Sequence, residues 1–368
     1  MRFAFLLMLL LIAFPAAAQT FRGSVLDEDL REPLPGAHVF VDGTRQGDVA
    51  AADGSFSLAL PDRRPLVIVI SMVGFKLQTV SITSRFDLQV AHEILLAEDP
   101  IILAEFVIEA VRPRALRRLR GRVDDLLFST TPAGSRCEIE NPQALQIENI
   151  NGALRIRSRE PVKVRNPYLG YRITIHGFRL EGTQRFYDFV GRLQFEELEV
   201  TTEKAMRARQ DRRLRTWNGS RQHFLRSLVE GTLSESGFTA ELVQSPGYTK
   251  GGHTIREALG DQDKGGSVLY GDPGDLTRSL IFSGALLVRY RRERPLQAYA
   301  SFLRSVNIAD PNTRDRVSWL ELPTGIALLD RNGVPFADGA TAPLSHYGYW
   351  SWERVCDNLP ADWAPPEG

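Results

Sequence analysis

Apolar and polar positions alternate with a period of two in the N-terminal third of the chain. Residues 55–60 place an apolar side chain at every second position, which predicts a strand with one buried face. Residues 66–72 are almost all apolar and predict a central strand buried on both faces. Further strands are predicted at 76–83, 88–96 and 105–110. This succession of short strands predicts an all-β unit.

Turn-forming residues separate the first of these strands. Pro35-Gly36 precedes the β-branched and aromatic run 37–41, and Asp42-Gly43 follows it. A second Asp-Gly pair, Asp53-Gly54, precedes the alternating strand. Proline fixes φ and glycine accepts a positive φ, so each of these pairs predicts a tight turn.

This order of turns and strands resembles the carboxypeptidase-like regulatory domain, a small transthyretin-like β-sandwich. The matching residues are Gly23-Ser24-Val25, Pro33-Leu34-Pro35-Gly36-Ala37, Gly43-Thr44, Asp53-Gly54-Ser55-Phe56 and Ser71-Met72-Val73-Gly74-Phe75. The resemblance covers residues 21–110 and implies a β-sandwich there. It implies little about function, because such domains are attached to many proteins. The same domain occurs at the N-termini of energy-coupled outer-membrane receptors, whose plug and barrel we do not expect in this chain.

The period changes from two to that of a helix after residue 110. The apolar residues of the segment 112–128 fall at helical spacing, and arginines occupy the remaining surface. We therefore expect an amphipathic connecting helix within residues 111–134. Its basic face could lie on an anionic membrane surface, or the helix could dock on the following domain with that face solvated.

Strands return between residues 135 and 199. Two long stretches, 171–176 and 187–195, alternate apolar and polar residues and predict an antiparallel pair of strands. Gly177 changes the alternation and predicts a β-bulge.

Residues 201–231 predict two consecutive helices. Thr201 or Thr202 can cap the first helix, and Asn218-Gly219 breaks it. Ser220 can cap the second helix, and Gly231 ends it.

The remaining sequence combines a glycine-rich loop with further strands. Residues 245–277 predict a flexible loop that is either disordered or functional. Strands are predicted at 280–290, 296–303, 317–322 and 326–330. Residues 135–368 thus predict a larger α+β domain with antiparallel strands, and the whole chain is mainly β or α+β.

Parts of this second domain also resemble known sequences. The segments 135–142, 221–228 and 347–354 resemble uncharacterised secreted Gram-negative proteins, in which a carboxypeptidase-like regulatory domain precedes a region of unknown function. This resemblance extends over most of the chain and implies no mechanism.

Residues 1–18 predict a signal peptide, with a basic start, an apolar core and an alanine-rich cleavage site. No later apolar run reaches the roughly 18 residues that span a bilayer, so we expect no transmembrane segment in the mature chain. The 45 basic and 45 acidic residues balance, which argues against nucleic acid as a partner. We expect the protein in the periplasm, at the outer-membrane periphery or on the cell surface.

The chain contains two cysteines, Cys137 and Cys356. An oxidising compartment allows them to form a disulfide. Two separate buried thiols are the alternative, and the sequence does not decide between them.

Catalytic motifs are missing from the sequence. None of the six histidines has the spacing of a zinc carboxypeptidase or an H-E-x-x-H site, and the cysteines have no ligand partners nearby, so we expect no metal. The chain has no G-x-S-x-G elbow, P-loop or G-x-G-x-x-G. We therefore expect no catalytic residues and no cofactor.

Two groups of residues are candidates for ligand binding. Tyr347, Tyr349, Trp350 and Trp352 with Arg354 could form an aromatic surface for a sugar or a protein partner, or could close the core of the second domain. Arg221 and His223, beside a basic helix, could hold a carboxylate or phosphate, or could lie on a solvated helix face.

These observations predict a non-catalytic protein of the cell envelope that binds a glycan, a peptide or an outer-membrane protein. One alternative is a hydrolase whose site is assembled within residues 135–368. Another is a purely structural envelope protein.

Overall fold

The computed structural model describes residues 19–61, 65–83, 88, 90–99, 121–183, 187–245, 255–259, 268–272, 274–305, 314–336 and 344–366. The expected signal peptide, the strand predicted at 105–110, most of the connecting helix and most of the 245–277 loop lie outside these residues. Within the connector, residues 121–127 are helical.

The N-terminal unit is a sandwich of two sheets. Its strands are β1 (Thr20–Asp27), β2 (His38–Val41), β3 (Gly47–Val49), β4 (Ser55–Ala59), β5 (Leu66–Ser71), β6 (Gln78–Ile82) and β7 (His92–Leu96). One sheet has the order β4-β1-β7 and the other β3-β2-β5-β6. The all-β unit predicted from the strand pattern, and the β-sandwich that the resemblance implies, are confirmed.

The sandwich core follows directly from the sequence pattern. In β4 only every second residue is buried, whereas every residue of β5 is buried. The tight turn before β4 requires glycine, because Gly54 has a φ of +76° and a Cβ there would lie 2.6 Å from the carbonyl oxygen of Val25. The side chains of β1, β2, β4 and β5 then enclose one apolar core.

A six-stranded sheet follows the connector. Its strands are β8 (Glu138–Ile139), β9 (Leu145–Ile150), β10 (Ala153–Ser158), β11 (Val162–Asn166), β12 (Tyr171–Gly182) and β13 (Tyr187–Glu197), with 3-10 turns η2 (Gly134–Arg136) and η3 (Pro142–Ala144). As predicted, β12 and β13 are antiparallel, and their register shifts between His176 and Arg179, around Gly177. β13 lies on the opposite side of β12 from β10 and β11.

Two helices, α3 (Glu203–Trp217) and α4 (Arg221–Glu230), come next, with the caps that the sequence predicts. The Thr202 side chain accepts a hydrogen bond from the amide of Ala205. The Ser220 side chain accepts a hydrogen bond from the amide of His223 at the start of α4, and Gly231 ends that helix in the left-handed conformation.

Two further sheets and three short helical segments complete the chain. They contain β14 (Phe238–Val243), β15 (Ile255–Leu259), β16 (Leu269–Tyr270), β17 (Thr277–Ile281), β18 (Ala285–Tyr290), α5 (Gln297–Ser305), β19 (Arg316–Glu321), β20 (Ile326–Asp330), β21 (Pro335–Phe336), β22 (Ser345–Gly348), α6 (Tyr349–Trp352) and η5 (Val355–Asp357). The sheet orders are β15-β14-β18-β19-β22 and β16-β17-β20-β21.

Two predictions for this part were wrong. The strand expected at 296–303 is the helix α5, whose buried residues Tyr299 and Leu303 are four positions apart, as a helix requires. The single strand expected at 280–290 is two strands, β17 and β18, because Gly284 turns the chain with a φ of +87°.

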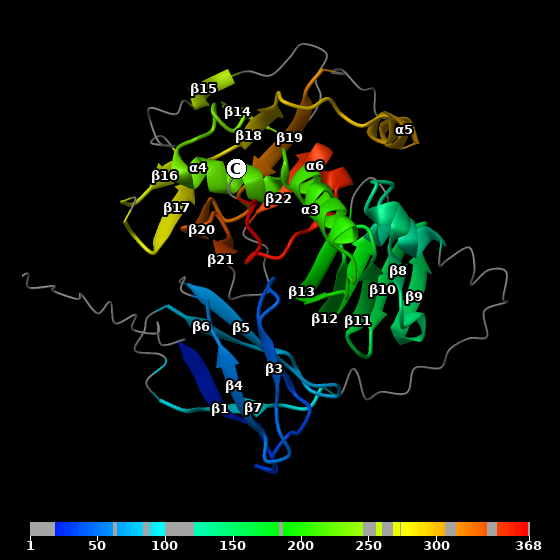
Figure 1. Ribbon diagram of the computed structural model, residues 1–368, viewed down its shortest axis with the longest axis vertical. Coiled ribbons are helices and arrows are strands. Elements are labelled where there is room, and N and C mark those ends of the chain that lie inside the picture. The colour runs from blue at the N-terminus through cyan, green and yellow to red at the C-terminus, as the bar shows by residue number, and fades with distance from the viewer. Residues whose placement is uncertain are drawn as a thin grey trace, which may run out of the picture.

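The sandwich, the six-stranded sheet and the region that begins with α3 meet around the C-terminal segment. In Figure 1 the sandwich lies below the other sheets, and the red C-terminal segment runs between α4, β13 and the sandwich. The Gln222 side chain donates a hydrogen bond to the carbonyl of Leu359, which holds this segment against α4. No helix in the described part of the chain has both the length and the apolar character to cross a membrane.

Candidate functional site

The turn after β2 joins the sandwich to the edge of the six-stranded sheet. The Gly43 amide donates to the carbonyl of Leu193 at 2.8 Å, and the Phe195 amide donates to the carbonyl of Thr44 at 2.9 Å. The Ala361 amide donates to the Gly43 carbonyl at 2.7 Å. The sandwich therefore extends the edge of β13 by backbone pairing, and the C-terminal segment fixes the same turn from the other side.

A partly buried ion pair reinforces this joint. Arg192 donates from Nη1 to Oδ2 of Asp42 at 2.7 Å, and the Leu193 amide donates to the other carboxylate oxygen at 3.2 Å. Burial raises the pKa of Asp42, and the Arg192 charge opposes that rise. Asp42 was predicted only as a turn residue, but it also carries a charge contact between the two regions.

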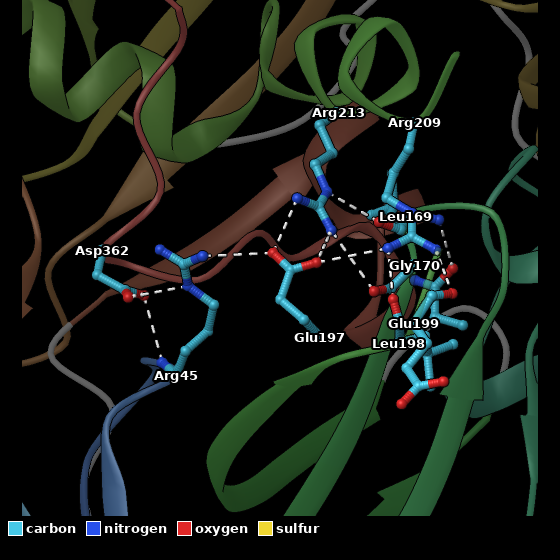
Figure 2. Close-up of polar contacts among 10 residues, drawn as sticks. Arg45, Leu169, Gly170, Glu197, Leu198, Glu199, Arg209, Arg213 and Asp362 are labelled. Carbon is cyan, nitrogen blue, oxygen red and sulfur yellow. Dashed lines mark hydrogen bonds and ion pairs between the residues drawn. The ribbon is translucent and has the colours of Figure 1, made fainter. Parts of the chain in front are cut away.

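A second charged cluster ties the end of β13 to α3 and to the C-terminal segment (Figure 2). The Glu197 carboxylate accepts two hydrogen bonds from Arg213, at 3.0 and 2.7 Å, and one from Arg45 of the sandwich, at 3.3 Å. Arg45 also donates from Nε to Asp362 at 3.0 Å. Some of the basic residues of α3 are thus engaged in contacts within the protein, and Arg213 is only 7% exposed.

A cavity of about 510 Å³, which we call the junction cavity, lies where these regions meet. The sandwich contributes the turn after β2 and the start of β5, and the six-stranded sheet contributes much of β13. The start of α4, β22 and the segment 353–359 form a further part of its lining, with smaller contributions from residues 126–127, 334–336 and Trp350. The volume falls in the range of small-molecule sites, and much of the wall is apolar or aromatic.

Two carboxyl groups from the segment after α6 line the junction cavity: Glu353 directly follows the helix, and Asp357 lies in η5. Asp357 accepts hydrogen bonds on Oδ2 from the Thr131 hydroxyl and from the Arg354 amide, both at 3.0 Å. Within the described residues, no donor reaches the Glu353 carboxyl group. Burial, together with the neighbouring Asp357 carboxyl group, raises the pKa of Glu353 to about 8. Burial also raises the pKa of Asp357 to about 7.

A guanidinium group lines the same cavity. Arg221 donates from Nη1 to Nδ1 of His346 at 2.9 Å. Burial, with Arg221 and Arg354 nearby, lowers the pKa of His346 well below its usual value. The imidazole is therefore neutral, and it orients the arginine by accepting one of its hydrogen bonds.

The structure brings four of the seven predicted binding residues to this cavity. Arg221, Tyr347, Trp350 and Arg354 line it, so members of the two candidate groups, distant in sequence, meet in one place. Tyr349, Trp352 and His223 are not in its lining. Whether any of these residues binds a ligand stays a prediction.

The C-terminal aromatic residues do not form an open platform. Tyr349, Trp350 and Trp352 are each at most 3% exposed. Trp350 donates from its indole nitrogen to the Gly219 carbonyl at 2.9 Å, and Trp352 donates to the Thr130 hydroxyl at 2.9 Å. These rings close the core, which is the alternative that the sequence left open. Large aromatic surfaces with satisfied N–H groups are most stable when buried.

Two other predicted residues also have structural contacts. The Gly219 amide donates to Nδ1 of His223 at 3.1 Å, and burial lowers the pKa of His223 to about 4. Arg354 is 5% exposed, donates to the Leu126 carbonyl and stacks 4.0 Å from the centroid of the Tyr187 ring. His223 is therefore a neutral residue at the start of α4, and Arg354, although it lines the cavity, is engaged in contacts with the protein.

Sequence reasoning missed Glu353, Asp357 and His346. All three are next to or within three residues of a residue that was singled out, and Glu353 lies between Trp352 and Arg354. A charged residue inside an aromatic run was the available signal, since such a residue must be buried with its neighbours or line a cavity.

The two cysteines form a disulfide in the structure. It joins Cys137, after η2, to Cys356 in η5, across 219 residues. Cys356 is adjacent to Asp357, so the bridge holds one wall of the junction cavity. Of the two alternatives that the sequence left open, the structure contains the bridge. Among the described residues, no three His, Cys, Asp or Glu side chains are grouped as a metal site would need.

Comparison with known proteins concerns the sandwich. Residues 21–108 match the family model of the CarboxypepD_reg-like domain. The N-terminal sandwich carries this domain. The resemblance predicted from the turns over residues 21–110 is thereby confirmed. The CarboxypepD_reg-like domain is non-catalytic.

One relative among curated proteins is the TonB-dependent receptor P39 of Formosa agariphila. It is 34% identical over 106 residues, which cover 27% of this chain and 10% of the receptor. The chain thus spans about a tenth of that receptor. The likeness supports an association of this kind of domain with the cell envelope, and it does not extend to the junction cavity as a whole.

Proposed function

We propose that the protein is a non-catalytic binding protein of the cell envelope, exported through its N-terminal signal segment. Its ligand, which we place in the junction cavity, comes from envelope glycans, peptides or an outer-membrane partner. The CarboxypepD_reg-like domain is the part shared with the TonB-dependent receptor, and it supports the envelope location.

One observation carries this proposal above the others. The junction cavity presents the Glu353 carboxyl group, which no donor among the described residues reaches, and the partly bonded Arg221 guanidinium, between walls that are partly apolar and partly polar. Both residues are partly buried, and polar groups that lose contact with water without gaining protein partners cost free energy. A ligand that hydrogen-bonds to them recovers this cost, as is typical of binding sites.

The proposal is tested by retention from an envelope extract. The purified mature chain is incubated with the extract and recovered, and bound material is identified by mass spectrometry. We compare it with Arg221→Gln/Glu353→Gln and with a control, Arg226→Gln/Glu230→Gln. The control removes an ion pair of 2.8 Å on α4 whose residues are outside the cavity lining.

Discrete material should be retained by the wild type and the control and be lost from the cavity variant. Retention of nothing by the wild type would contradict a binding function. Equal retention by the cavity variant would remove the cavity from the proposal.

The paired carboxyl groups favour one second candidate, a hydrolase acting on an envelope glycan. Glu353 and Asp357 line one cavity, and two carboxyl groups in one site are what a glycoside hydrolase uses as its acid–base pair. However, such a pair needs one ionised and one protonated carboxyl group at the working pH. The pKa values of about 8 and about 7 leave Glu353 largely protonated and Asp357 about half ionised at neutral pH, so burial separates the two groups only weakly into an acid and a base. We therefore rank binding above hydrolysis; glycan cleavage that Glu353→Gln and Asp357→Asn abolish would reverse that order.

A further inference from the structure

The junction cavity presents an arginine and a glutamic acid that form no ion pair with each other. Arg221 comes from the start of α4, and Glu353 follows α6. Each charge alters the pKa of the other, so they share one environment, yet no ion pair joins them in the described structure. Of the hydrogen-bond donors of Arg221, one is used by the neutral His346. The remaining donors and the Glu353 oxygens are available to a third group.

We propose that the junction cavity binds a small zwitterion, such as a short peptide with free ends, with the ligand's ammonium group at the Glu353 carboxylate and its carboxylate at the Arg221 guanidinium. This inference rests on the binding function proposed above and names its ligand class. A guanidinium presents parallel N–H groups that match a carboxylate, and a carboxylate accepts from an ammonium group. The body of the ligand would contact the apolar and aromatic wall, including Leu225, Tyr187 and Trp350.

The other charges around Glu353 leave this pairing intact. Besides Arg221 on α4, they are Asp357 on η5, Arg316 on β19 and Glu293 before α5. Arg316 is already bonded to Glu293 and to the Asn218 carbonyl, and Asp357 accepts two hydrogen bonds on one oxygen. Glu353 and Arg221 are thus the least committed charges in the group. A neutral sugar would satisfy neither charge, which is why we favour a zwitterion over a glycan.

Isothermal titration calorimetry with the mature chain tests the ligand class. The probes are a set of unblocked dipeptides of apolar residues, the same set N-acetylated, the same set C-amidated, and maltose as a neutral sugar. We expect binding of unblocked dipeptides, at least a tenfold loss on acetylation, a similar loss on amidation, and no binding of maltose.

Matched variants assign each end of the ligand to its residue. Glu353→Gln should weaken unblocked dipeptides at least tenfold but leave the weaker acetylated set unchanged, because the same contact is already lost. Arg221→Gln should weaken unblocked dipeptides at least tenfold but leave the weaker amidated set unchanged. The controls Arg226→Gln and Glu230→Gln should bind as the wild type does. A variant that merely distorts the fold would weaken all sets alike.

The affinity should also depend on pH. The bound ammonium group requires an ionised Glu353, so affinity should rise between pH 6 and pH 8 in the wild type. It should rise much less in Glu353→Gln, where only the more distant Asp357 still ionises in this range.

Every outcome bears on the proposal. Absence of dipeptide binding, equal binding of blocked and unblocked sets, or binding of maltose instead would overturn the zwitterion. If dipeptides fail but envelope material is still retained through the cavity, the binding function stands and only the ligand class is wrong. If neither is bound, both proposals fail.

Discussion

The sandwich and the junction cavity show how differently a sequence encodes a fold and a site. The sandwich core contains apolar side chains from strands that are close in sequence, and tight turns fix their order. The junction cavity collects Asp42, Arg221 and Glu353 from three distant segments. Local patterns are therefore enough to predict the sandwich, whereas the chemistry depends on long-range contacts.

Loss of the disulfide should destabilise residues 135–368, the second region, far more than it destabilises the sandwich. We expect Cys137→Ala/Cys356→Ala to lower the free energy of unfolding of the second region by up to about 5 kcal/mol, because the bridge closes a loop of more than 200 residues. All five tryptophans lie after residue 216, so tryptophan fluorescence in urea reports this region alone. Hydrogen exchange of β5 should be unchanged, since that strand is in the sandwich core. Equal loss of protection in β5 would show that the regions unfold together.

The same bridge predicts a simple chemical result. The unreduced, unfolded protein should show no reactive thiol, because both cysteines are in the disulfide. Two reactive thiols per chain would contradict the bridge.

The joint between the regions should be the next most sensitive feature. Arg192→Ala leaves the Asp42 carboxylate partly buried without its charge partner, and we expect a loss of about 2 kcal/mol in stability. The Gly43 amide, which donates to Leu193, should exchange faster in the variant. The control is Arg31→Ala, which breaks a pair on the sandwich whose side chains are both 59% exposed and should cost less than about 1 kcal/mol. Equal effects of the two variants would mean that the joint adds no stability.

The smallest expected effect is a gain in stability at the site itself. The folded-state pKa of Glu353, about 8, is above its usual value of 4.5. Ionisation therefore costs the folded state nothing below about pH 4.5 and increasingly more as pH rises toward 8. Glu353→Gln removes this cost, and we expect it to stabilise the protein by about 1 kcal/mol at pH 9 and by almost nothing at pH 5. Urea unfolding at both pH values measures the difference, and a loss of stability at pH 9 would show that the carboxylate has a protein partner.

Much of the fold could be predicted from the sequence. The caps at Thr202, Ser220 and Gly231 and the bulge at Gly177 are local effects of one or a few residues, and they are present as predicted. Helix α5 was mistaken for a strand because its apolar run is short. A short run does not distinguish the helical spacing of apolar residues from the alternation of a strand.

The site could be predicted only in part. Arg221, Tyr347, Trp350 and Arg354 were singled out by residue type, and they do line one cavity. That they meet, and that Glu353 among them has no donor in the described structure, depends on how β13, α4 and the C-terminal segment pack. No local pattern carries that information.

The most direct test of the account is an experimental structure of the chain saturated with an unblocked dipeptide that it binds. The account predicts density in the junction cavity, with one end within hydrogen-bond distance of Arg221 and the other of Glu353. A saturated complex with the ligand elsewhere, or with its ends directed away from both residues, would contradict it.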